Sequence, residues 1–417
     1  MCKIYGELFA KLKIDGIIIY FQPIFSFFNQ TVFGVEALAR GVKNEKIISP
    51  LELFKRAEEN NVILELDRCC RDKALQAFAH QILPKYPNMF LFVNLNPQII
   101  TERKDFGQAT DFFVQELGLK SNQIVLEICE DRTDNQKLLL QYVQHYQKNN
   151  YLIALDDVGN AYSNFNRLLL LTPHIYKIDR ELVKDVSKSW IKNKMVSSLC
   201  YLSREIGALV VAEGVETQED ALELLEFGID LLQGYYFARP LSFDKLDLSE
   251  GIQKLRAISK KFKICMQQKL LRRKKFILKI KKITKNILLE LEKFSIQDWE
   301  QILKDKICLY QGKIVLDCLY VLDTNGIQLT ETICNGKKNP KAAILNPAHK
   351  GTNLSCRPYF YTLYISEVNY YVSNPYISMA TGRKCITVSK LFFKNNCQYV
   401  LCVDVDLENS AELHPDA

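Results

Sequence analysis

Residues 153–159 read Ile153-Ala154-Leu155-Asp156-Asp157-Val158-Gly159, an apolar run that ends in two adjacent carboxylates and a glycine. The apolar residues are those of a buried strand. Folding alone does not favour Asp156 beside Asp157, because neighbouring carboxylates repel each other. A divalent cation such as Mg²⁺ or Mn²⁺ would relieve this repulsion through oxygen ligands. A simple turn is the alternative, because Asp and Gly are common turn residues.

Strand-like and helix-like segments alternate on both sides of this stretch, after two strands that a short turn connects. The predicted strands are 17–24, 33–40, 89–97, 124–130, 153–159, 175–179, 209–216 and 229–235. The predicted helices are one that opens at Ser49-Pro50, then 62–83, 107–117, 135–148, 163–171, 181–206 and 217–227. This alternation indicates a parallel sheet covered by helices. About eight strands in roughly 240 residues favour a closed (β/α)₈ barrel over the alternative, an open doubly wound sheet.

Polar side chains stand at or near the carboxyl ends of six of these strands. They are Asn94, Glu127, Asp156, Lys177, Glu213 and Gln233. In a barrel these ends meet on one face, where barrel enzymes place their active sites. Together with Glu36 and Asp157, the carboxylates and the amide supply oxygen ligands for one or two hard cations.

Two basic residues suit phosphate chemistry. Lys177 could hold a water or a developing charge, and Arg40 could contact a phosphate oxygen; a structural ion pair and a solvated strand end are the alternatives. The five histidines are dispersed, which excludes an H-E-x-x-H zinc hydrolase, and no P-loop motif is present. The residues therefore predict metal-dependent hydrolysis of a phosphate ester.

The order of the motifs resembles that of the EAL domain family over roughly residues 1–245. The matching motifs are Gln22-Pro23-Ile24, Glu36-Ala37-Leu38-x-Arg40, Asn94, Glu127-x-x-Glu130, Asp156-Asp157-x-Gly159, Lys177-Ile178-Asp179, Glu213-Gly214-Val215-Glu216 and Gln233-Gly234. The resemblance implies hydrolysis of cyclic di-GMP to linear pGpG on a modified TIM (β/α)₈ barrel, with two Mg²⁺ or Mn²⁺ ions.

The resemblance also implies roles for individual residues. The implied metal ligands are Glu36, Asn94, Glu127 and Asp156, with Asp157 and Glu213 on the side of the second metal. The implied catalytic residues are Lys177, which would contact the nucleophilic water, and Glu213, Asp157 and Glu36. The implied substrate-binding or site-shaping residues are Gln22, Arg40 and Gln233. Glu130 corresponds to the glutamate that holds the loop after the paired aspartates.

That loop departs from the usual family sequence. Val158 replaces a phenylalanine, Ala161 replaces a glycine that adopts positive φ more easily, and Cys129 replaces a threonine. Since the implied metal ligands are intact, we expect an enzyme. The alternatives are a catalytically weak or inactive receptor for cyclic di-GMP and a dimeric scaffold on a membrane surface.

Residues 248–304 are predicted to be a connecting helix between the barrel, 1–247, and a second domain, 305–417. Apolar residues at three- and four-residue spacing, such as Phe276 and Ile280, predict pairing of this helix in a homodimer. Residues 254–285 contain fourteen Lys or Arg and no Asp or Glu. A solvated helix face explains this charge, and attraction to an anionic membrane surface is the functional alternative. We expect no nucleic-acid polymer as a partner, because recognition-module motifs are absent.

Residues 305–417 predict an antiparallel sheet with a few helices, an α+β domain. Asp323-x-Asn325-Gly326 and Arg357-Pro358-Tyr359-Phe360 resemble the PAS/Cache-like sensory domains of YkuI-type EAL proteins. The resemblance implies a small-molecule ligand, which the sequence does not identify. Scattered cysteines, the lack of a signal-peptide core and the lack of a long apolar run predict a cytoplasmic protein.

Overall fold

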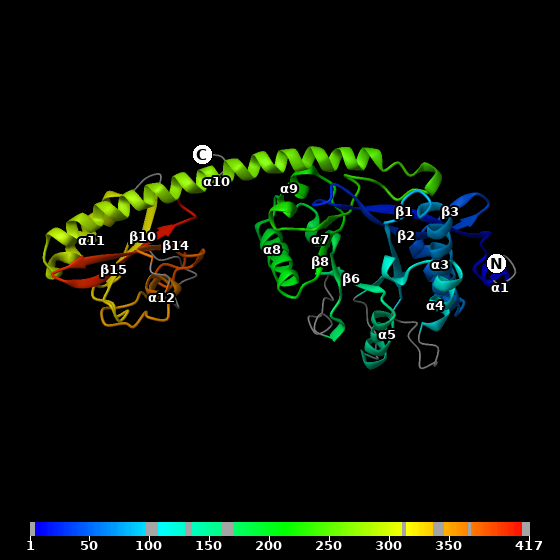
Figure 1. The fold of residues 1–417 in the computed structure, drawn as a ribbon, viewed down its shortest axis with the longest axis horizontal. Coiled ribbons are helices and arrows are strands. Elements are labelled where there is room, and N and C mark those ends of the chain that lie inside the picture. Colours follow the sequence, from blue (N-terminus) through cyan, green and yellow to red (C-terminus); the bar gives the residue numbers. More distant parts are fainter. Residues whose placement is uncertain are drawn as a thin grey trace. The chain divides into compact units, whose positions relative to one another are not determined.

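The computed structural model describes residues 5–96, 107–129, 136–159, 170–310, 314–336, 346–365 and 368–410. The chain divides into two compact units, Met1–Lys263 and Ile264–Ala417 (Figure 1). A membrane-spanning helix needs a long stretch of apolar residues, and none of the helices in the described part of the chain contains one.

The strands of the first unit form a closed ring of eight. Its members are β1 (Gly16–Ser26), β2 (Thr31–Lys43), β4 (Phe90–Leu95), β5 (Ile124–Cys129), β6 (Leu152–Val158), β7 (Ile175–Ile178), β8 (Leu209–Ala212) and β9 (Leu231–Leu232), with β3 (Lys46–Ile48) attached to β2. β1 runs antiparallel to both of its ring neighbours, β2 and β9, whereas the ring pairs from β2 to β9 are parallel. The ring confirms a modified (β/α)₈ barrel and excludes the open sheet.

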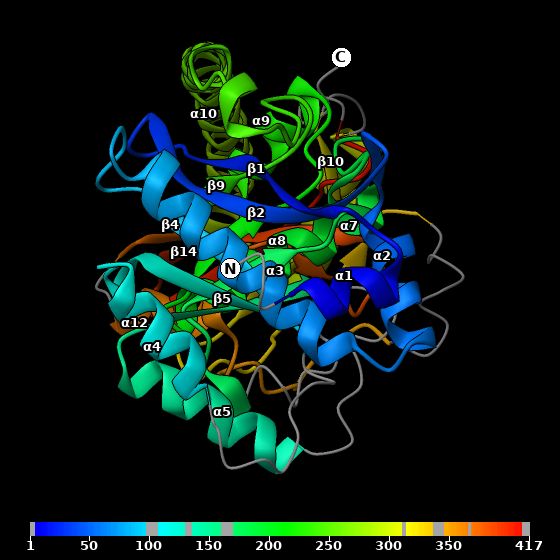
Figure 2. The ribbon, with the colours of Figure 1, turned by 90° about the vertical axis from the view of Figure 1, so that its right-hand side faces the viewer.

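Helices follow most of these strands, and α3, α4 and α5 lie outside the barrel (Figure 2). The α-helices of this unit before α10 are α1 (Gly6–Leu12), α2 (Pro50–Glu59), α3 (Ile63–Ala77), α4 (Gln108–Glu116), α5 (Gln136–Lys148), α7 (Arg180–Val183), α8 (Trp190–Glu205) and α9 (Gln218–Glu226). Short helical turns are η1 (Phe78–Ile82), η3 (Ser121–Gln123) and η4 (Phe243–Lys245). α2 begins as predicted, with the Ser49 side chain accepting a hydrogen bond from the Glu52 amide.

The single helix predicted over 181–206 is wrong, because the structure has two helices there, α7 and α8. Asp185 lies between them with a φ of 57°, a left-handed conformation that interrupts a helix. Ser189 then caps α8 by accepting a hydrogen bond from the Lys192 amide. Most of the helix predicted over 163–171 lies outside the described residues.

The second unit contains an antiparallel sheet in the order β11-β10-β15-β14-β12, with β13 paired to β14. Its elements are α11 (Trp299–Leu309), β10 (Val315–Leu322), β11 (Ile333–Cys334), α12 (Pro358–Ile365), β12 (Tyr370–Val372), β13 (Tyr376–Ile377), β14 (Lys384–Lys394) and β15 (Cys397–Asp406), with the turn η5 (Ile296–Asp298) before α11. One face of the sheet packs against α11 and the C-terminal half of α10, and α12 packs on the other. The predicted α+β architecture is therefore present.

α10 (Ser249–Lys293) is a continuous helix of 45 residues, and apolar residues are buried in its N-terminal and C-terminal parts. Leu255 and Ile258 join a core of the first unit. Phe276 and Ile280 join the core of the second unit. The chain's own sheet and barrel helices therefore cover these four residues of the stripe, whereas the pairing of this helix in a homodimer stays a prediction.

A buried carboxyl group makes the second unit sensitive to pH. Asp404 on β15 is 4% exposed and accepts a hydrogen bond of 2.7 Å from the Thr387 hydroxyl. Burial raises the pKa of Asp404 to about 7. Because this pKa lies above the unfolded value of about 3.9, the proton's contribution to stability is full at low pH and is lost as the pH rises towards 7.

We therefore expect the urea midpoint of the second unit to fall between pH 4 and pH 7, and to fall less in Asp404→Asn. Urea titrations followed by circular dichroism at several pH values measure the difference. Asp305→Asn, which alters an exposed aspartate of α11, is the control and should keep the wild-type slope. Parallel pH profiles of wild type and Asp404→Asn would contradict the assignment.

Candidate active site

Side chains along a strand alternate between the two faces of the sheet, and this alternation places the site residues inside the barrel. A layer of apolar residues fills the interior, with one contributed by each of seven strands: Ile24, Phe92, Val125, Ala154, Ile175, Val211 and Leu231. On parallel strands, the residue two positions later points to the same side. Those positions hold Asn94, Glu127, Asp156, Lys177, Glu213 and Gln233, and on antiparallel β1 the residue two positions earlier is Gln22. The predicted polar ends therefore converge directly above an apolar plug.

Lys177 on β7 lies at the centre of this polar layer and is 1% exposed. Its ammonium lies 2.5 Å from Glu127 Oε1 and 3.3 Å from Asp156 Oδ1. It lies 3.5 Å from Glu36 Oε2 and also forms an ion pair with Glu213. Burial lowers the pKa of Lys177, but the surrounding carboxylates outweigh burial and raise this pKa well above its usual value. Lys177 therefore remains a cation.

One ammonium does not balance this layer, because four carboxylates surround it. Glu127 is completely buried, and neither of its side-chain oxygens takes part in a hydrogen bond, although Oε1 is within ion-pair distance of Lys177. Burial, then the charge of Glu36, raises the pKa of Glu127 well above its usual value. Buried carboxylate oxygens without hydrogen bonds, next to further carboxylates, are a donor set that fits a hard divalent cation.

The paired aspartates end β6 in different environments. Asp156 is 7% exposed and faces the barrel interior, and it accepts a 3.1 Å hydrogen bond from the Asp157 amide. Asp157 has a φ of 56°, a left-handed backbone conformation that is uncommon outside glycine. Burial, then the charge of Asp156, raises the pKa of Asp157 to about 7. Ligand atoms of Asp156, Asp157 and Cys129 lie within 4.8 Å of one another.

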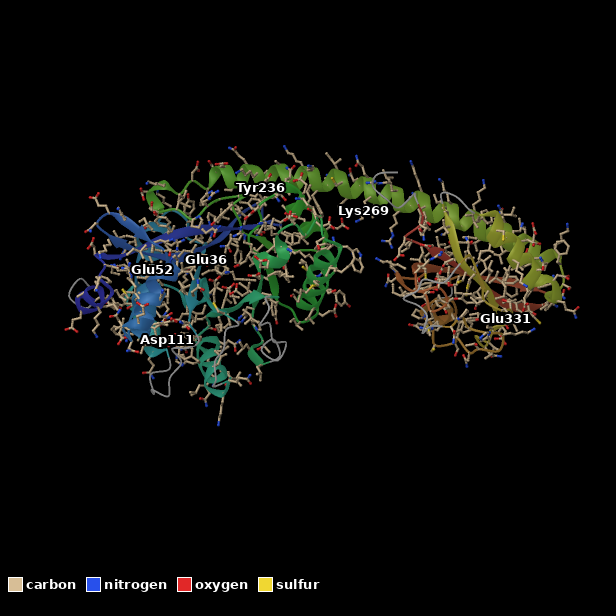
Figure 3. All side chains as sticks on the ribbon, turned by 180° about the vertical axis from the view of Figure 1, so that it is seen from behind. Glu36, Glu52, Asp111, Tyr236, Lys269 and Glu331 are labelled. Atoms are coloured by element: carbon tan, nitrogen blue, oxygen red, sulfur yellow. The ribbon has the colours of Figure 1, made fainter. Side chains whose placement is uncertain are left out.

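Glu36 on β2 accepts hydrogen bonds from two side-chain amides. Gln233 Nε2 donates a 2.6 Å hydrogen bond to Glu36 Oε2, and Asn94 Nδ2 donates a 3.4 Å bond to Oε1. Gln233 also donates to Gln22, which is the register partner of Glu36 across the β1–β2 pair. Gln233 therefore contacts Glu36 directly, and Gln22 contacts Gln233. Figure 3 shows Glu36 within the barrel unit, whereas Glu52 and Asp111 lie at its periphery.

A cavity of about 420 Å³ opens beside this layer, and Arg40 lies in its wall together with Asn94 and Cys129. Arg40 is half-buried, and its guanidinium lies 5.6 Å from the centre of the Tyr20 ring and donates to the Ala39 carbonyl. A cation beside the acidic layer suits an anionic ligand in the cavity. The role of Arg40 in contacting a phosphate therefore stays a prediction.

Two charged residues of the cavity wall were not predicted from the sequence. Arg71 and Asp67 on α3 line the cavity as a buried ion pair of 2.6 Å, and Arg71 also donates to the Thr110 hydroxyl. The signal was the i, i+4 spacing of opposite charges on a mostly apolar helix face. Glu130, Asn160 and Ala161, on which the predicted loop contacts depend, lie outside the described residues.

Gly234 follows Gln233 where two segments approach closely. A Cβ atom there would lie 2.2 Å from both the backbone nitrogen and the backbone oxygen of Val215. We expect Gly234→Ala to lower the free energy of unfolding by about 1–3 kcal/mol, the range for overpacking, and to displace Gln233 from Glu36. Urea denaturation measures the loss. Gly16→Ala, where nothing lies within 4 Å, is the matched control, and equal stability of the two variants would contradict the expectation.

A closed barrel whose interior strand ends carry one lysine among several carboxylates, beside a cavity with an arginine, defines the class of this protein. The chain belongs to the EAL domain family, whose domain matches residues 6–240. The family resemblance of the sequence motifs is therefore confirmed.

Relatives and solved structures cover different shares of the chain. The cyclic di-GMP phosphodiesterase PdeR of Escherichia coli K12 is 28% identical over 237 residues, which are 56% of this chain, and the chain spans only 35% of PdeR. The EAL-domain protein YkuI of Bacillus subtilis 168 is 26% identical over 391 residues, 90% of this chain and 92% of YkuI.

The crystal structure of YkuI, in complex with substrate c-di-GMP and calcium, matches with a TM-score of 0.79 at 24% identity. It covers 96% of this chain and 98% of that chain, so the likeness of fold includes the C-terminal sheet. A c-di-GMP-bound EAL protein of Vibrio cholerae O395 matches with a TM-score of 0.50 at 26% identity, over 55% of this chain and 93% of that one.

Proposed function

We propose that the barrel hydrolyses cyclic di-GMP to linear pGpG. The observation that carries the proposal is the layer of Glu36, Glu127, Asp156 and Glu213 around Lys177, which has more carboxylates than cations. Membership of the EAL domain family, with cyclic di-GMP phosphodiesterases among the relatives, supports this substrate.

Each group of the site has a task in this reaction. Two divalent ions, Mg²⁺ or Mn²⁺, would be held by Glu36, Asn94, Glu127 and Asp156, with Asp157 and Glu213 on the side of the second ion. When bound, such ions supply a nucleophile at neutral pH and stabilise the leaving oxygen. Lys177 stays protonated and holds the attacking water or the negative charge that develops on the phosphate. Arg40 in the cavity wall contacts a phosphate oxygen.

The same proposal covers the whole chain. The barrel of 1–247 is followed by the connecting helix of 248–304 and by a PAS/Cache-like sensory domain of 305–417, which regulates hydrolysis when a small molecule binds. The protein acts as a homodimer. The similarity to YkuI along 90% of the chain supports the order of a barrel followed by a C-terminal domain.

A second candidate is a receptor that binds cyclic di-GMP without cutting it. It is favoured by Cys129, whose sulfur lies 4.0 Å from Asn94 Oδ1, within the predicted ligand set. The experiment that separates the candidates is incubation of the purified protein with cyclic di-GMP and Mg²⁺ or Mn²⁺, followed by quantification of pGpG.

We expect pGpG to form with either ion, to cease with a chelator and to be absent in Glu36→Ala. Binding of cyclic di-GMP, measured by calorimetry in Ca²⁺, runs beside the assay. Tight binding without any pGpG would replace the enzyme by the receptor. Absence of both binding and hydrolysis would contradict both candidates for the isolated chain.

A further inference from the structure

We propose that the face of α10 turned away from the protein between Ile264 and Lys285 binds an anionic lipid surface. This segment contains nine Lys or Arg residues and no Asp or Glu. All residues from 267 to 275 are exposed, so that the central turns of the segment present every side chain to solvent. Lys269, labelled in Figure 3, lies in these turns.

Apolar side chains repeat along the outward face. Ile264, Leu271 and Leu278 follow one another every seven residues and are 54%, 58% and 55% exposed. Leu271 and the buried Ile280 are nine residues apart, which is about two and a half helical turns, so they point in opposite directions. The helix therefore has a buried stripe that packs on its own sheet and a second, exposed stripe on the opposite side.

The composition of the exposed face argues against a second copy of this chain as its occupant. A coiled-coil seam needs apolar residues at two positions of every seven. Three residues after Ile264 and Leu271 stand Gln267 and Lys274, and four residues after Leu271 stands Lys275. A symmetric pair of such helices would set lysines against lysines, which is unfavourable.

A lipid surface can bind both the basic and the apolar side chains of this face. Acidic headgroups attract the exposed Lys274, Lys275 and Lys282, which lie within about 60° of Leu271 around the helix axis. The boundary between headgroups and acyl chains accepts exposed leucine and isoleucine side chains. A nucleic acid would satisfy the charges but would leave Leu271 and Leu278 in water. The alternation of basic and apolar residues on one exposed helix face therefore points to lipid.

The test is sedimentation of the purified full chain with vesicles of phosphatidylcholine, with and without phosphatidylglycerol. We expect binding only to vesicles that contain phosphatidylglycerol, with an affinity that falls as salt is added. The variant Arg272→Gln, Arg273→Gln, Lys274→Gln, Lys275→Gln should bind at least about 10-fold more weakly, since each basic residue near such a surface contributes to attraction.

The matched control removes the same charge from exposed lysines elsewhere, as Lys11→Gln, Lys55→Gln, Lys304→Gln, Lys350→Gln, and should bind like the wild type. A second variant, Leu271→Ser with Leu278→Ser, keeps the charge and should also lose affinity. Circular dichroism checks that all variants are folded.

Any of the following results would overturn the proposal. The first is absence of binding to phosphatidylglycerol vesicles, and the second is equal weakening by the helix variant and by its control. The third is dissociation of a dimer by the serine variant in analytical ultracentrifugation, which would assign the face to a second copy. Binding of duplex DNA or RNA that the serine variant retains, without vesicle binding, would assign the face to nucleic acid.

Discussion

Glu127→Gln is expected to lower the rate of cyclic di-GMP hydrolysis at least about 100-fold while the barrel remains folded. Glutamine has the shape of glutamate but lacks its charge, so a hard cation loses a strong ligand and Lys177 loses an ion-pair partner at 2.5 Å. Outer-shell partners of metal ligands already contribute about 10- to 100-fold to activity or metal affinity, and a ligand itself contributes more.

Formation of pGpG at saturating Mn²⁺ measures the rate, and calorimetric titration with Mn²⁺ alone measures the affinity for the ion. Both should fall together in Glu127→Gln. Glu116→Gln, which removes an exposed carboxylate at the end of α4, should leave both unchanged. If Glu127→Gln kept wild-type affinity for Mn²⁺, Glu127 would not be a metal ligand.

Trp299→Ala is expected to destabilise the second unit by about 3–5 kcal/mol, the range for removing a large buried aromatic side chain. Trp299 is completely buried, and its ring centre lies 5.0 Å from that of Tyr399 and 5.7 Å from that of Phe392. Its indole nitrogen donates a 2.9 Å hydrogen bond to the Leu291 carbonyl near the end of α10. The substitution therefore removes packing between α11, α10 and the sheet.

The chain offers a matched control, because its only other tryptophan, Trp190 at the start of α8, is 71% exposed. Trp190→Ala should change stability by no more than about 0.5 kcal/mol. Trp299→Phe keeps one aromatic ring but loses the hydrogen bond, at about 1 kcal/mol, and part of the ring packing, so its effect should lie between those of the other two variants. Urea unfolding followed by circular dichroism measures all three variants. Similar midpoints for Trp299→Ala and Trp190→Ala would refute the assigned role of the buried ring.

Much of the barrel could be predicted from the sequence, because buried parallel strands are short apolar runs and the helices between them are amphipathic. The polar residue at the end of each strand could also be predicted, because it interrupts an apolar run, as Asp156 does after Ala154 and Leu155. The closing contact could not be foreseen in detail. β9 contains only Leu231 and Leu232, and its pairing with antiparallel β1 depends on the curvature of the whole ring.

Contacts between side chains far apart in the sequence could not be predicted from the sequence. The hydrogen bond from Gln233 to Glu36 joins residues 197 positions apart, so no local pattern reports it. The apolar stripe of α10 shows a different limit of prediction from sequence. An apolar stripe on a helix indicates that something covers it, and only the structure shows that Phe276 and Ile280 are covered by the chain's own sheet.

The layer of site residues above the apolar plug takes its members one by one from separate strands. Each strand is fixed by backbone hydrogen bonds to its two neighbours, which do not depend on the polar side chain it carries. A single substitution can therefore remove one chemical group while the others keep their places. In evolutionary terms, such a barrel is a scaffold in which a mutation at one strand end can change the chemistry of the site without unfolding the backbone of the ring.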